Sequence, residues 1–348
     1  MIDRRGGEKE SMVDHTLRMD RRAALKLLGT AAGSLALPSA AFAGSPSKPM
    51  AKPLRGLFPI ASTPFTADNK LDFDCLNAEV TFCNRGGVPG LIWPQIASGW
   101  SNLSASERFA GAESMIAAGK GGKTAIVIGV QTQGNDLPGA IAFAKHAAKT
   151  GADAICSLPP EGGNAAMMEY YKAIGAATDL PLIVQTIGDM PVDLVVEMYK
   201  AIPTMRVVKD EAGDPVKRVT ELRAKTDGKL AVFAGKGVRQ MMDEMRLGFT
   251  GFCPTVGMAD VFQQAWELYE AGKIRESYDM FGRIQAFSTI VNADRYVMVA
   301  RGIFKDSTKS RPTPGMGASG APQPPLDDAD KKDVRAALDT YLKPYLRA

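Results

Sequence analysis

Histidine is almost absent from this chain, since only His15 and His146 occur in 348 residues. Catalytic triads and many zinc sites depend on imidazole, so the composition argues against both kinds of site. The formal net charge is only +4. A charge so near balance gives no reason to expect a nucleic acid or an anionic membrane surface as a partner.

Nucleotide-binding and metal-binding motifs are missing as well. The sequence has no P-loop, no dinucleotide-binding fingerprint and no metal-ligand spacing, and Gly235-Lys236-Gly237 is too short a glycine signal to indicate a phosphate site. We therefore expect no cofactor and no metal.

The four cysteines form no C-x-x-C pair. Cys75 and Cys83 fall on one predicted helix, where their spacing along the axis would be roughly 12 Å, too far for a disulfide. Cys156 and Cys253 fall in predicted strands, where a small buried hydrophobic residue is the simpler interpretation. We expect four free thiols.

Residues 1–43 have the pattern of an export signal. Arg21-Arg22 precede a short apolar run, Leu27–Leu37, and Ala41-Phe42-Ala43 forms a small-x-small cleavage site. The arginine pair is typical of the twin-arginine route. We predict recognition by the twin-arginine export machinery, cleavage after Ala43 and a periplasmic protein.

A disordered basic tail on a cytosolic enzyme is the alternative for the same residues, and Met1, Met12 and Met19 leave the true start codon open. Residues 44–53 are expected to form a linker. No later run is apolar enough to cross a bilayer, so we expect no membrane span in the mature protein.

From residue 56 onward, short apolar runs alternate with segments of helical periodicity. The runs mostly lack strict alternation, which is typical of parallel strands that are buried on both faces. Eight such units predict a (β/α)8 TIM barrel over residues 54–256. The predicted strands are Gly56–Thr63, Gly90–Gln95, Thr124–Val130, Ala154–Pro159, Pro181–Thr186, Arg206–Glu211, Leu230–Gly235 and Gly251–Val256.

Residues 257–348 are expected to add the last barrel helix and extra C-terminal helices within the same domain. Helical periodicity recurs here, a Pro- and Gly-rich stretch at Thr308–Pro325 predicts an irregular loop, and acidic residues open the final helix. The predicted helices are Met258–Ala271, Ile274–Val291, Ala293–Ile303 and Asp328–Leu346.

Lys209 is the leading candidate for a catalytic residue. It lies near the carboxyl end of the predicted strand Arg206–Glu211, which is the only predicted strand with a lysine inside its apolar run. Catalytic groups of such barrels project from the carboxyl ends of strands, and a desolvated lysine amine can attack a carbonyl to form an imine. A lysine that snorkels from the strand end, or is held by Glu211, is the structural alternative. Lys236 is the nearest competitor, but its glycine-flanked position predicts an exposed loop.

Six motifs, taken in order, resemble the dihydrodipicolinate synthase / N-acetylneuraminate lyase family. They run from about Leu54 to the end of the chain, and each alone is weak. The motifs are Thr63-Pro64-Phe65, Gly86-Gly87-Val88-Pro89-Gly90-Leu91, Leu103-Ser104-Ala105-Ser106-Glu107-Arg108, Asp179-Leu180-Pro181-Leu182-Ile183, Lys209-Asp210-Glu211-Ala212-Gly213-Asp214 and Leu247-Gly248-Phe249-Thr250-Gly251. The resemblance implies a homo-oligomeric barrel that acts on a 2-oxo acid through an imine on Lys209.

The chain departs from the family pattern at several site positions. Where the family has G-T-T-G-E after strand two, this chain has Gln95-Ile96-Ala97-Ser98-Gly99. The family's tyrosine at the end of strand five is Gln185 here, and the tyrosine pair after strand four is missing. The arginine that would grip a second carboxylate has no match in residues 187–190. An amide cannot transfer protons near neutral pH, so we do not expect dihydrodipicolinate synthesis.

Another acid or base must then act if catalysis is retained. Glu161, in the loop after strand four, is the leading candidate, with a solvated loop acid as the alternative. Glu211 and Asp214 are expected to support the strand end instead.

Five further residues are expected to contact the substrate. Ser98 and the backbone near Ala97 would hold its carboxylate, and Gln185 and Thr186 would orient it. Cys253 would either shape the pocket or pack in the core.

Two functions follow from these expectations. The first is an exported class I, Schiff-base lyase, aldolase or dehydratase that acts on a 2-oxo acid or a sugar-derived acid. The second is a catalytically impaired barrel that binds a small acid as a periplasmic binding or sensing protein. The substrate and the size of the oligomer are not fixed by the sequence.

Overall fold

The computed structural model describes residues 52–291, 293–312 and 326–348. The predicted twin-arginine signal peptide (residues 1–43) and most of the linker (residues 44–53) lie outside the described residues, so cleavage after Ala43 stays a prediction. In the described part of the chain, no helix is both long enough and apolar enough to span a bilayer.

Eight parallel strands form one sheet, as predicted from the apolar runs. The strand order β1-β8-β7-β6-β5-β4-β3-β2 leaves β1 and β2 as the neighbours that must close the ring. The strands are β1 Gly56–Leu57, β2 Gly90–Trp93, β3 Ala125–Gly129, β4 Ala154–Ser157, β5 Leu182–Gln185, β6 Met205–Asp210, β7 Ala231–Ala234 and β8 Gly251–Phe252.

The sheet closes between β1 and β2 through a short seam just beyond β1. Ile92 N donates to Pro59 O at 3.0 Å, and Ala61 N donates to Ile92 O at 3.0 Å. Strands β1 and β8 are shorter than the sequence predicts because Pro59 and Pro254 have no N–H to donate to a strand ladder. The result is the predicted (β/α)8 TIM barrel.

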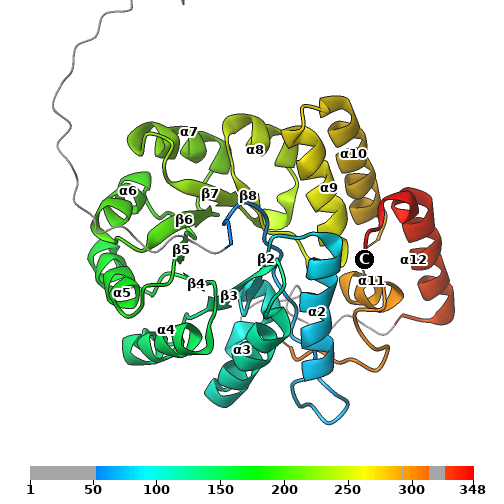
Figure 1. The fold of residues 1–348 in the computed structure, drawn as a ribbon, viewed down its shortest axis with the longest axis horizontal. Coiled ribbons are helices and arrows are strands. Elements are labelled where there is room, and N and C mark those ends of the chain that lie inside the picture. The colour runs from blue at the N-terminus through cyan, green and yellow to red at the C-terminus, as the bar shows by residue number, and fades with distance from the viewer. Residues whose placement is uncertain (1–51, 292, 313–325) are drawn as a thin grey trace, which may run out of the picture. The chain divides into compact units, whose positions relative to one another are not determined.

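Helices surround the strands, and the extra helices lie on one side beyond α9 and α2 (Figure 1). Helix α10 packs on α9 and α12, and α11 packs on α12. Helix α12 ends five residues before the predicted Leu346, and a short 3-10 turn, Lys343–Tyr345, follows. The helices are α2 Phe73–Gly86, α3 Ala105–Gly119, α4 Leu137–Thr150, α5 Asn164–Ala176, α6 Val192–Ala201, α7 Pro215–Lys225, α8 Met241–Leu247, α9 Ala259–Glu270, α10 Ile274–Ile290, α11 Asp294–Ala300 and α12 Asp328–Tyr341.

Side chains at the helix ends explain why α2 and α3 begin and end where they do. The Asp72 carboxylate accepts a hydrogen bond from Cys75 N at the start of α2, and Gly87, with φ of 71°, ends that helix. Ser104 and Glu107 form a reciprocal capping box at the start of α3. These caps place the loops that follow β1 and β2 at the carboxyl end of the barrel.

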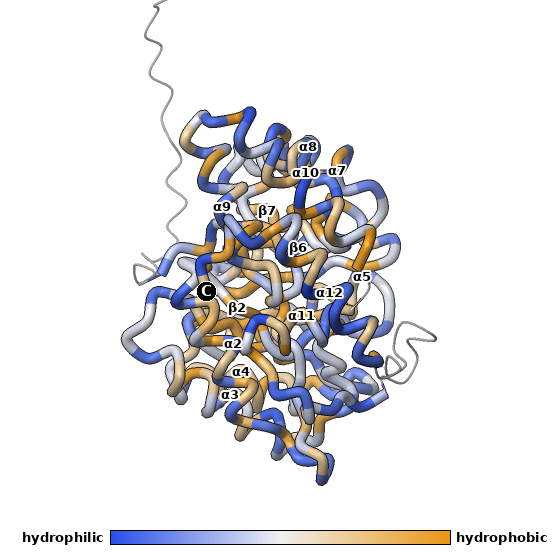
Figure 2. The backbone as a smooth tube through the Cα atoms, turned by 90° about the vertical axis from the view of Figure 1, so that its right-hand side faces the viewer, coloured by the Kyte–Doolittle hydropathy of each residue, from blue (hydrophilic) through white to orange (hydrophobic). Residues whose placement is uncertain are grey.

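The apolar residues form two layers, one outside the sheet and one inside the barrel. The outer layer packs the helices on the strands, and the hydropathy colouring accordingly shows the outer turns mostly blue (Figure 2). The inner cluster is Leu54, Phe58, Ile60, Ile92, Ala125, Val127, Ala154, Cys156, Ile183, Val207, Phe233 and Cys253. All four cysteines are buried free thiols, as predicted.

Candidate active site

Lys209 lies inside the barrel near the carboxyl end of β6. Successive side chains of a strand point to opposite faces, so Lys209 shares a face with Val207, which belongs to the inner cluster. The residue is 4% exposed. In the register of β5 and β6, Lys209 is paired with Gln185, whose neighbour on the same face, Ile183, also belongs to the inner cluster. The amine and the amide therefore both project into the barrel.

Glu211 is the acid that meets this amine. Its Oε1 lies 2.8 Å from Lys209 Nζ and accepts from Lys236 N at 3.1 Å, and its Oε2 accepts from Gln185 Nε2 at 2.5 Å. Burial is the largest single influence and acts to raise the pKa of Glu211, but the Lys209 ammonium and the hydrogen bonds from Lys209, Lys236 N and Gln185 together outweigh it, so the net pKa lies below the ordinary value. The carboxylate is therefore ionised at neutral pH.

Gly235 makes room for this carboxylate at the end of β7. A Cβ atom at residue 235 would lie only 1.6 Å from Glu211 Oε1. Any side chain there would displace the acid from Lys209. Lys236, the competitor for Lys209, is exposed as predicted and donates to Gly213 O.

Thr186 holds the end of β6 in place. Its hydroxyl donates to Asp210 Oδ1 at 2.6 Å and accepts from Glu211 N and Ala212 N. Asp210 in turn forms an ion pair with Arg218 at 2.9 Å on the outer face of the strand. The hydroxyl of Thr186, which we predicted to orient the substrate, is thus engaged in positioning the backbone of Glu211.

The two inner cysteines lie beside the amine as neutral thiols. Burial raises the pKa of Cys253 to about 12, and the Lys209 ammonium offsets only part of that shift. Cys156 is shifted in the same direction for the same reason. These thiols supply apolar surface around the amine.

Two tyrosines on α5 support the ends of β4 and β5 from outside the barrel. Tyr171 Oη donates to both Ser157 O and Gln185 O, and Tyr170 Oη lies 2.9 Å from Ser157 Oγ. These residues were not predicted from the sequence. A tyrosine pair between two predicted strands carries no signal that its hydroxyls return to the sheet.

Ala97 and Ser98 lie in a 3-10 turn, Ile96–Ser98, that follows β2. The Ser98 hydroxyl donates to Ala61 O at 2.6 Å and accepts from Gln95 N at 3.0 Å. These bonds fasten the loop after β2 to the segment after β1. The hydroxyl predicted to bind the carboxylate is therefore used in the fold, although both Ser98 and Ala97 line a cavity.

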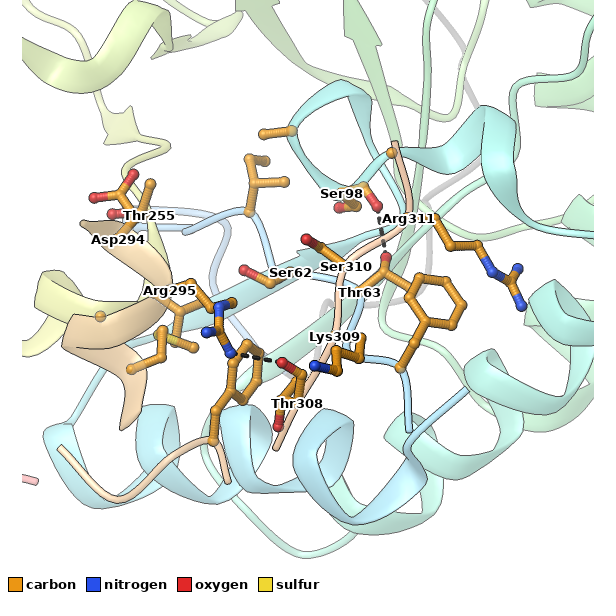
Figure 3. Close-up of a pocket in the computed structure, with 18 of the residues that line it drawn as sticks. Ser62, Thr63, Ser98, Thr255, Asp294, Arg295, Thr308, Lys309, Ser310 and Arg311 are labelled. Carbon is orange, nitrogen blue, oxygen red and sulfur yellow. Dashed lines mark hydrogen bonds between the residues drawn. The ribbon is translucent and has the colours of Figure 1, made fainter. Parts of the chain in front are cut away.

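That cavity has a volume of about 270 Å³ and opens at the carboxyl end of the barrel (Figure 3). Residues after β1, β2 and β8 form one part of its wall, and α11 with residues 308–311 forms the other. Lys209 is not among the lining residues, but Ile60 is, and Ile60 also belongs to the inner cluster. The cavity thus borders the barrel interior on the side of β8, β1 and β2.

The wall formed by residues 308–311 is held by long-range contacts. Phe65 and Lys309 exchange two backbone hydrogen bonds, at 2.7 and 2.9 Å. Arg311 pairs with Glu107 at 2.8 Å and stacks over the Phe65 ring at 3.9 Å. Arg295 donates to Thr308 O at 2.6 Å, as the dashed line in Figure 3 shows.

Glu161 lies in the exposed loop after β4, away from these contacts. Its backbone N–H donates to Asn135 Oδ1, and its carbonyl accepts from Asn135 Nδ2. The structure thus brings Lys209, Gln185 and Glu211 together and leaves Glu161 in an exposed loop. Across residues 52–291, 293–312 and 326–348, no cluster of three or more His, Cys, Asp or Glu side chains could hold a metal ion.

Glu79 is a buried acid beneath the cavity wall. It is fully buried on α2, and one of its carboxylate oxygens accepts from Ser62 N at 2.9 Å; Ser62 lines the cavity. Burial raises the pKa of Glu79 well above the ordinary value, although the Ser62 bond opposes the shift. The carboxyl group is therefore held in its neutral form to a higher pH than an exposed glutamate.

We expect Glu79→Gln to remove a pH dependence of stability. Between the ordinary pKa and the raised one, the folded protein holds a proton that the unfolded chain has lost. The free energy of unfolding of the wild type then falls as the pH rises, by up to about 1.4 kcal/mol per unit. Glutamine keeps the neutral shape and does not titrate.

The measurement is denaturant unfolding from pH 5 to 8, with exposed Glu197→Gln as the matched control. The stability difference between Glu79→Gln and the wild type should grow with pH. Parallel curves for all three proteins would show that Glu79 titrates normally.

Residues 53–302 match the family described as the dihydrodipicolinate synthetase family. A 4-hydroxy-tetrahydrodipicolinate synthase of Methanosarcina mazei is 29% identical over 189 residues, which cover 52% of this chain and 63% of that protein. A probable 2-dehydro-3-deoxy-D-pentonate aldolase of Escherichia coli is 28% identical over 142 residues, which cover 40% of this chain and 46% of that protein. Both matches span less than two thirds of the relative's length.

Solved structures share the fold over most of the chain. A dihydrodipicolinate synthase from Rhodopseudomonas palustris superposes with a TM-score of 0.69 at 21% identity, covering 82% of this chain and 97% of that one. An N-acetylneuraminate lyase from Mycoplasma synoviae superposes with a TM-score of 0.71 at 18% identity, covering 83% and 98%. At identities this low, the likeness shows a shared fold, the barrel and its helices, and no more.

Proposed function

The chain belongs to the dihydrodipicolinate synthetase family, and from this premise we propose that it is an imine-forming lyase that acts on a 2-oxo acid. The observation that carries the proposal is the buried amine of Lys209, 2.8 Å from the Glu211 carboxylate, inside the barrel. An amine in this position can form the covalent intermediate, and the adjacent acid can move its protons.

Imine formation needs only these two groups and the substrate. Glu211 takes a proton from the Lys209 ammonium, and the freed amine attacks the carbon of the 2-oxo group. A second amine proton passes to the oxo oxygen. The proton held by Glu211 then leaves with that oxygen as water, so a protonated imine remains and Glu211 is ionised again.

The protonated imine can then draw electrons from a neighbouring bond. In a 4-hydroxy-2-oxo acid, the hydroxyl gives its proton to Glu211, the bond between C3 and C4 breaks, and an aldehyde leaves. The enamine that stays on Lys209 is protonated at carbon and hydrolysed. Gln185 orients Glu211 through the bond between its Nε2 and Glu211 Oε2.

The assignment of proton transfer to Glu211 differs from the sequence expectation for Glu161. Glu211 contacts the amine directly, whereas Glu161 lies in an exposed loop. With Gln185 in place of the family's tyrosine, we do not propose synthesis of dihydrodipicolinate. The name of the aldolase relative supports the carbon–carbon cleavage of a sugar-derived acid instead.

Borohydride trapping tests the proposal. Incubation of the wild type with pyruvate and borohydride should add the mass of one reduced pyruvyl group to Lys209. Lys209→Arg keeps a cation beside Glu211 but cannot form an imine, so it should gain no mass. Lys236→Arg is the matched control and should trap like the wild type. An unmodified wild type, or an adduct that survives in Lys209→Arg, would refute the assignment.

Binding without turnover is the second candidate function. The observation in its favour is Gln185, which cannot transfer protons, at the position of the family's tyrosine. This protein would trap pyruvate on Lys209 but release no aldehyde from any 4-hydroxy-2-oxo acid. In both cases we propose a homo-oligomer that acts in the periplasm after twin-arginine export, and N-terminal sequencing of exported protein that still begins before Arg21 would refute the export.

A further inference from the structure

Two buried amide side chains at the carboxyl end of the barrel have an oxygen without a partner among the described residues. Gln95 follows β2 and Gln185 ends β5, and each is 1% exposed. In both residues the side-chain Oε1 has no hydrogen bond. Gln185 stands where the family has a tyrosine, and Gln95 stands where the family has a glycine, so both amides are particular to this chain.

The orientation of the Gln185 amide is fixed by its neighbour. Glu211 is ionised and can only accept hydrogen bonds, so the NH2 group of Gln185 must face it. The carbonyl oxygen of the amide therefore has to point elsewhere. Because Gln185 and Lys209 are paired across β5 and β6, the Gln185 side chain starts from the layer of the barrel that contains the amine.

The orientation of the Gln95 amide is fixed by a chain of two hydrogen bonds. The carbonyl oxygen of Pro94 can only accept, so Gln131 Nε2 must face it, at 2.8 Å. Gln131 Oε1 is then the acceptor for Gln95 Nε2 at 3.3 Å. The Oε1 atom of Gln95 therefore has no donor. Rotating either amide by 180° would place two acceptors or two donors against each other.

The other unpaired polar atoms in the described residues have a different explanation. They belong to Glu79, Glu244, Arg108 and Arg301. Each glutamate has a pKa raised by burial and can become neutral. Each arginine makes hydrogen bonds through its terminal nitrogens. An amide oxygen cannot change its charge, and leaving it buried and unpaired costs about 1–3 kcal/mol.

We infer that Gln185 and Gln95 are specificity-determining residues whose amide oxygens accept hydrogen bonds from hydroxyl groups of the substrate. The inference rests on the proposed function, and it selects a hydroxylated 2-oxo acid over an unsubstituted or a dicarboxylic one. A hydroxyl group donates to an amide oxygen, whereas a methylene group leaves it unpaired and a carboxylate is repelled by it.

A matched pair of ligands tests this inference. The two acids 4-hydroxy-2-oxopentanoate and 2-oxopentanoate differ by one hydroxyl group. We expect the wild type to reach half-saturation of borohydride trapping at about a 2- to 12-fold lower concentration of the hydroxylated acid, as one net hydrogen bond implies. The mass of the adduct separates the intact acid from pyruvate released by cleavage.

The variants assign the preference to the amides. Gln185→Met and Gln95→Met keep the length of the side chain but remove the acceptor, and at least Gln185→Met should lose the preference. Exposed Gln133→Met, in a loop at the same end of the barrel, is the control and should keep it. An equal response of the wild type to both acids, or a preference that survives in Gln185→Met, overturns the inference.

Calorimetry on Lys209→Arg separates this inference from the proposed function. Binding there is noncovalent, so a preference for the hydroxylated acid should remain although trapping is lost. Trapping of both acids by the wild type without a preference would leave the proposed function standing and overturn the inference. A preference in calorimetry without any trapping by the wild type would overturn the proposed function and leave the amide contacts standing. If neither acid binds, the proposed function and the inference are both overturned.

Discussion

Glu211→Gln should lower kcat for cleavage of a 4-hydroxy-2-oxo acid by about 100- to 10,000-fold, the range in which a positioned proton donor or acceptor contributes. Glutamine has nearly the shape of glutamate and can still accept a hydrogen bond, but it cannot take a proton from the Lys209 ammonium or from the substrate hydroxyl. The buried ammonium also loses the counter-charge that lies 2.8 Å away.

The pH profile separates proton transfer from a structural role of Glu211. Its pKa is lowered by Lys209, so wild-type activity should hold as the pH falls and be lost only below the ordinary glutamate range, where the carboxylate is protonated. Glu211→Gln should lack this acid limb. Slow trapping of pyruvate should persist in the variant because Lys209 is intact.

Glu161→Gln is the rival variant in this experiment. A large loss of kcat in Glu161→Gln, together with near-normal turnover of Glu211→Gln, would return the proton-transfer role to the exposed loop. The same outcome would reduce Glu211 to a counter-ion of Lys209.

The second large effect concerns a buried ion pair between α9 and the residue that follows α11. Asp260 is fully buried, and its carboxylate meets the Arg301 guanidinium with bonds of 2.7 and 2.8 Å. Arg301 also donates to Gly257 O and Ala348 O, and Asp260 accepts from Arg347 N. The pair thus joins the last barrel helix to the C-terminal segment.

We expect Asp260→Ala to lower the free energy of unfolding by about 3–5 kcal/mol, because it leaves an arginine charge buried and unpaired. The double variant Asp260→Ala/Arg301→Met should recover part of this loss, since an apolar side chain there needs no partner. Denaturant unfolding measures both. The surface pair of Arg283 and Asp279 provides the control, and Asp279→Ala should cost at most about 1 kcal/mol. A similarly small effect of Asp260→Ala would mean that water reaches Arg301.

The barrel was predictable because each strand is an apolar run bounded by glycine or proline, and burial on both faces leaves that pattern in the sequence. The predicted strands were too long where a proline interrupts the hydrogen bonding between strands, as at Pro59 and Pro254. The predicted final helix was also too long, because the segment that contains Pro344 forms only a 3-10 turn. These differences are local and follow from a missing N–H group.

The candidate site was predictable only in part. Lys209 was identifiable as a lysine inside an apolar run. The alternation of side chains along a strand also places Glu211 on the face of Lys209 and Asp210 on the opposite face, in keeping with the predicted alternative in which Glu211 holds Lys209. A role of Glu211 in proton transfer was not predicted, because Glu161 was the candidate for it. The cavity wall was out of reach, because residues near 63, 97, 256 and 309 meet only through the closure of the barrel and the long-range pairing of Phe65 with Lys309.

Because Phe65 pairs with Lys309, the reactive residues and one wall of the entrance come from different parts of the sequence. The amine lies on β6 and its acid directly follows that strand, whereas one side of the entrance is formed by residues 308–311, which dock on Phe65 from 244 positions further along the chain. Substitutions within residues 308–311 could therefore reshape which molecules are admitted while leaving the chemistry untouched. Such a stretch offers a natural starting point for redirecting this scaffold to other substrates.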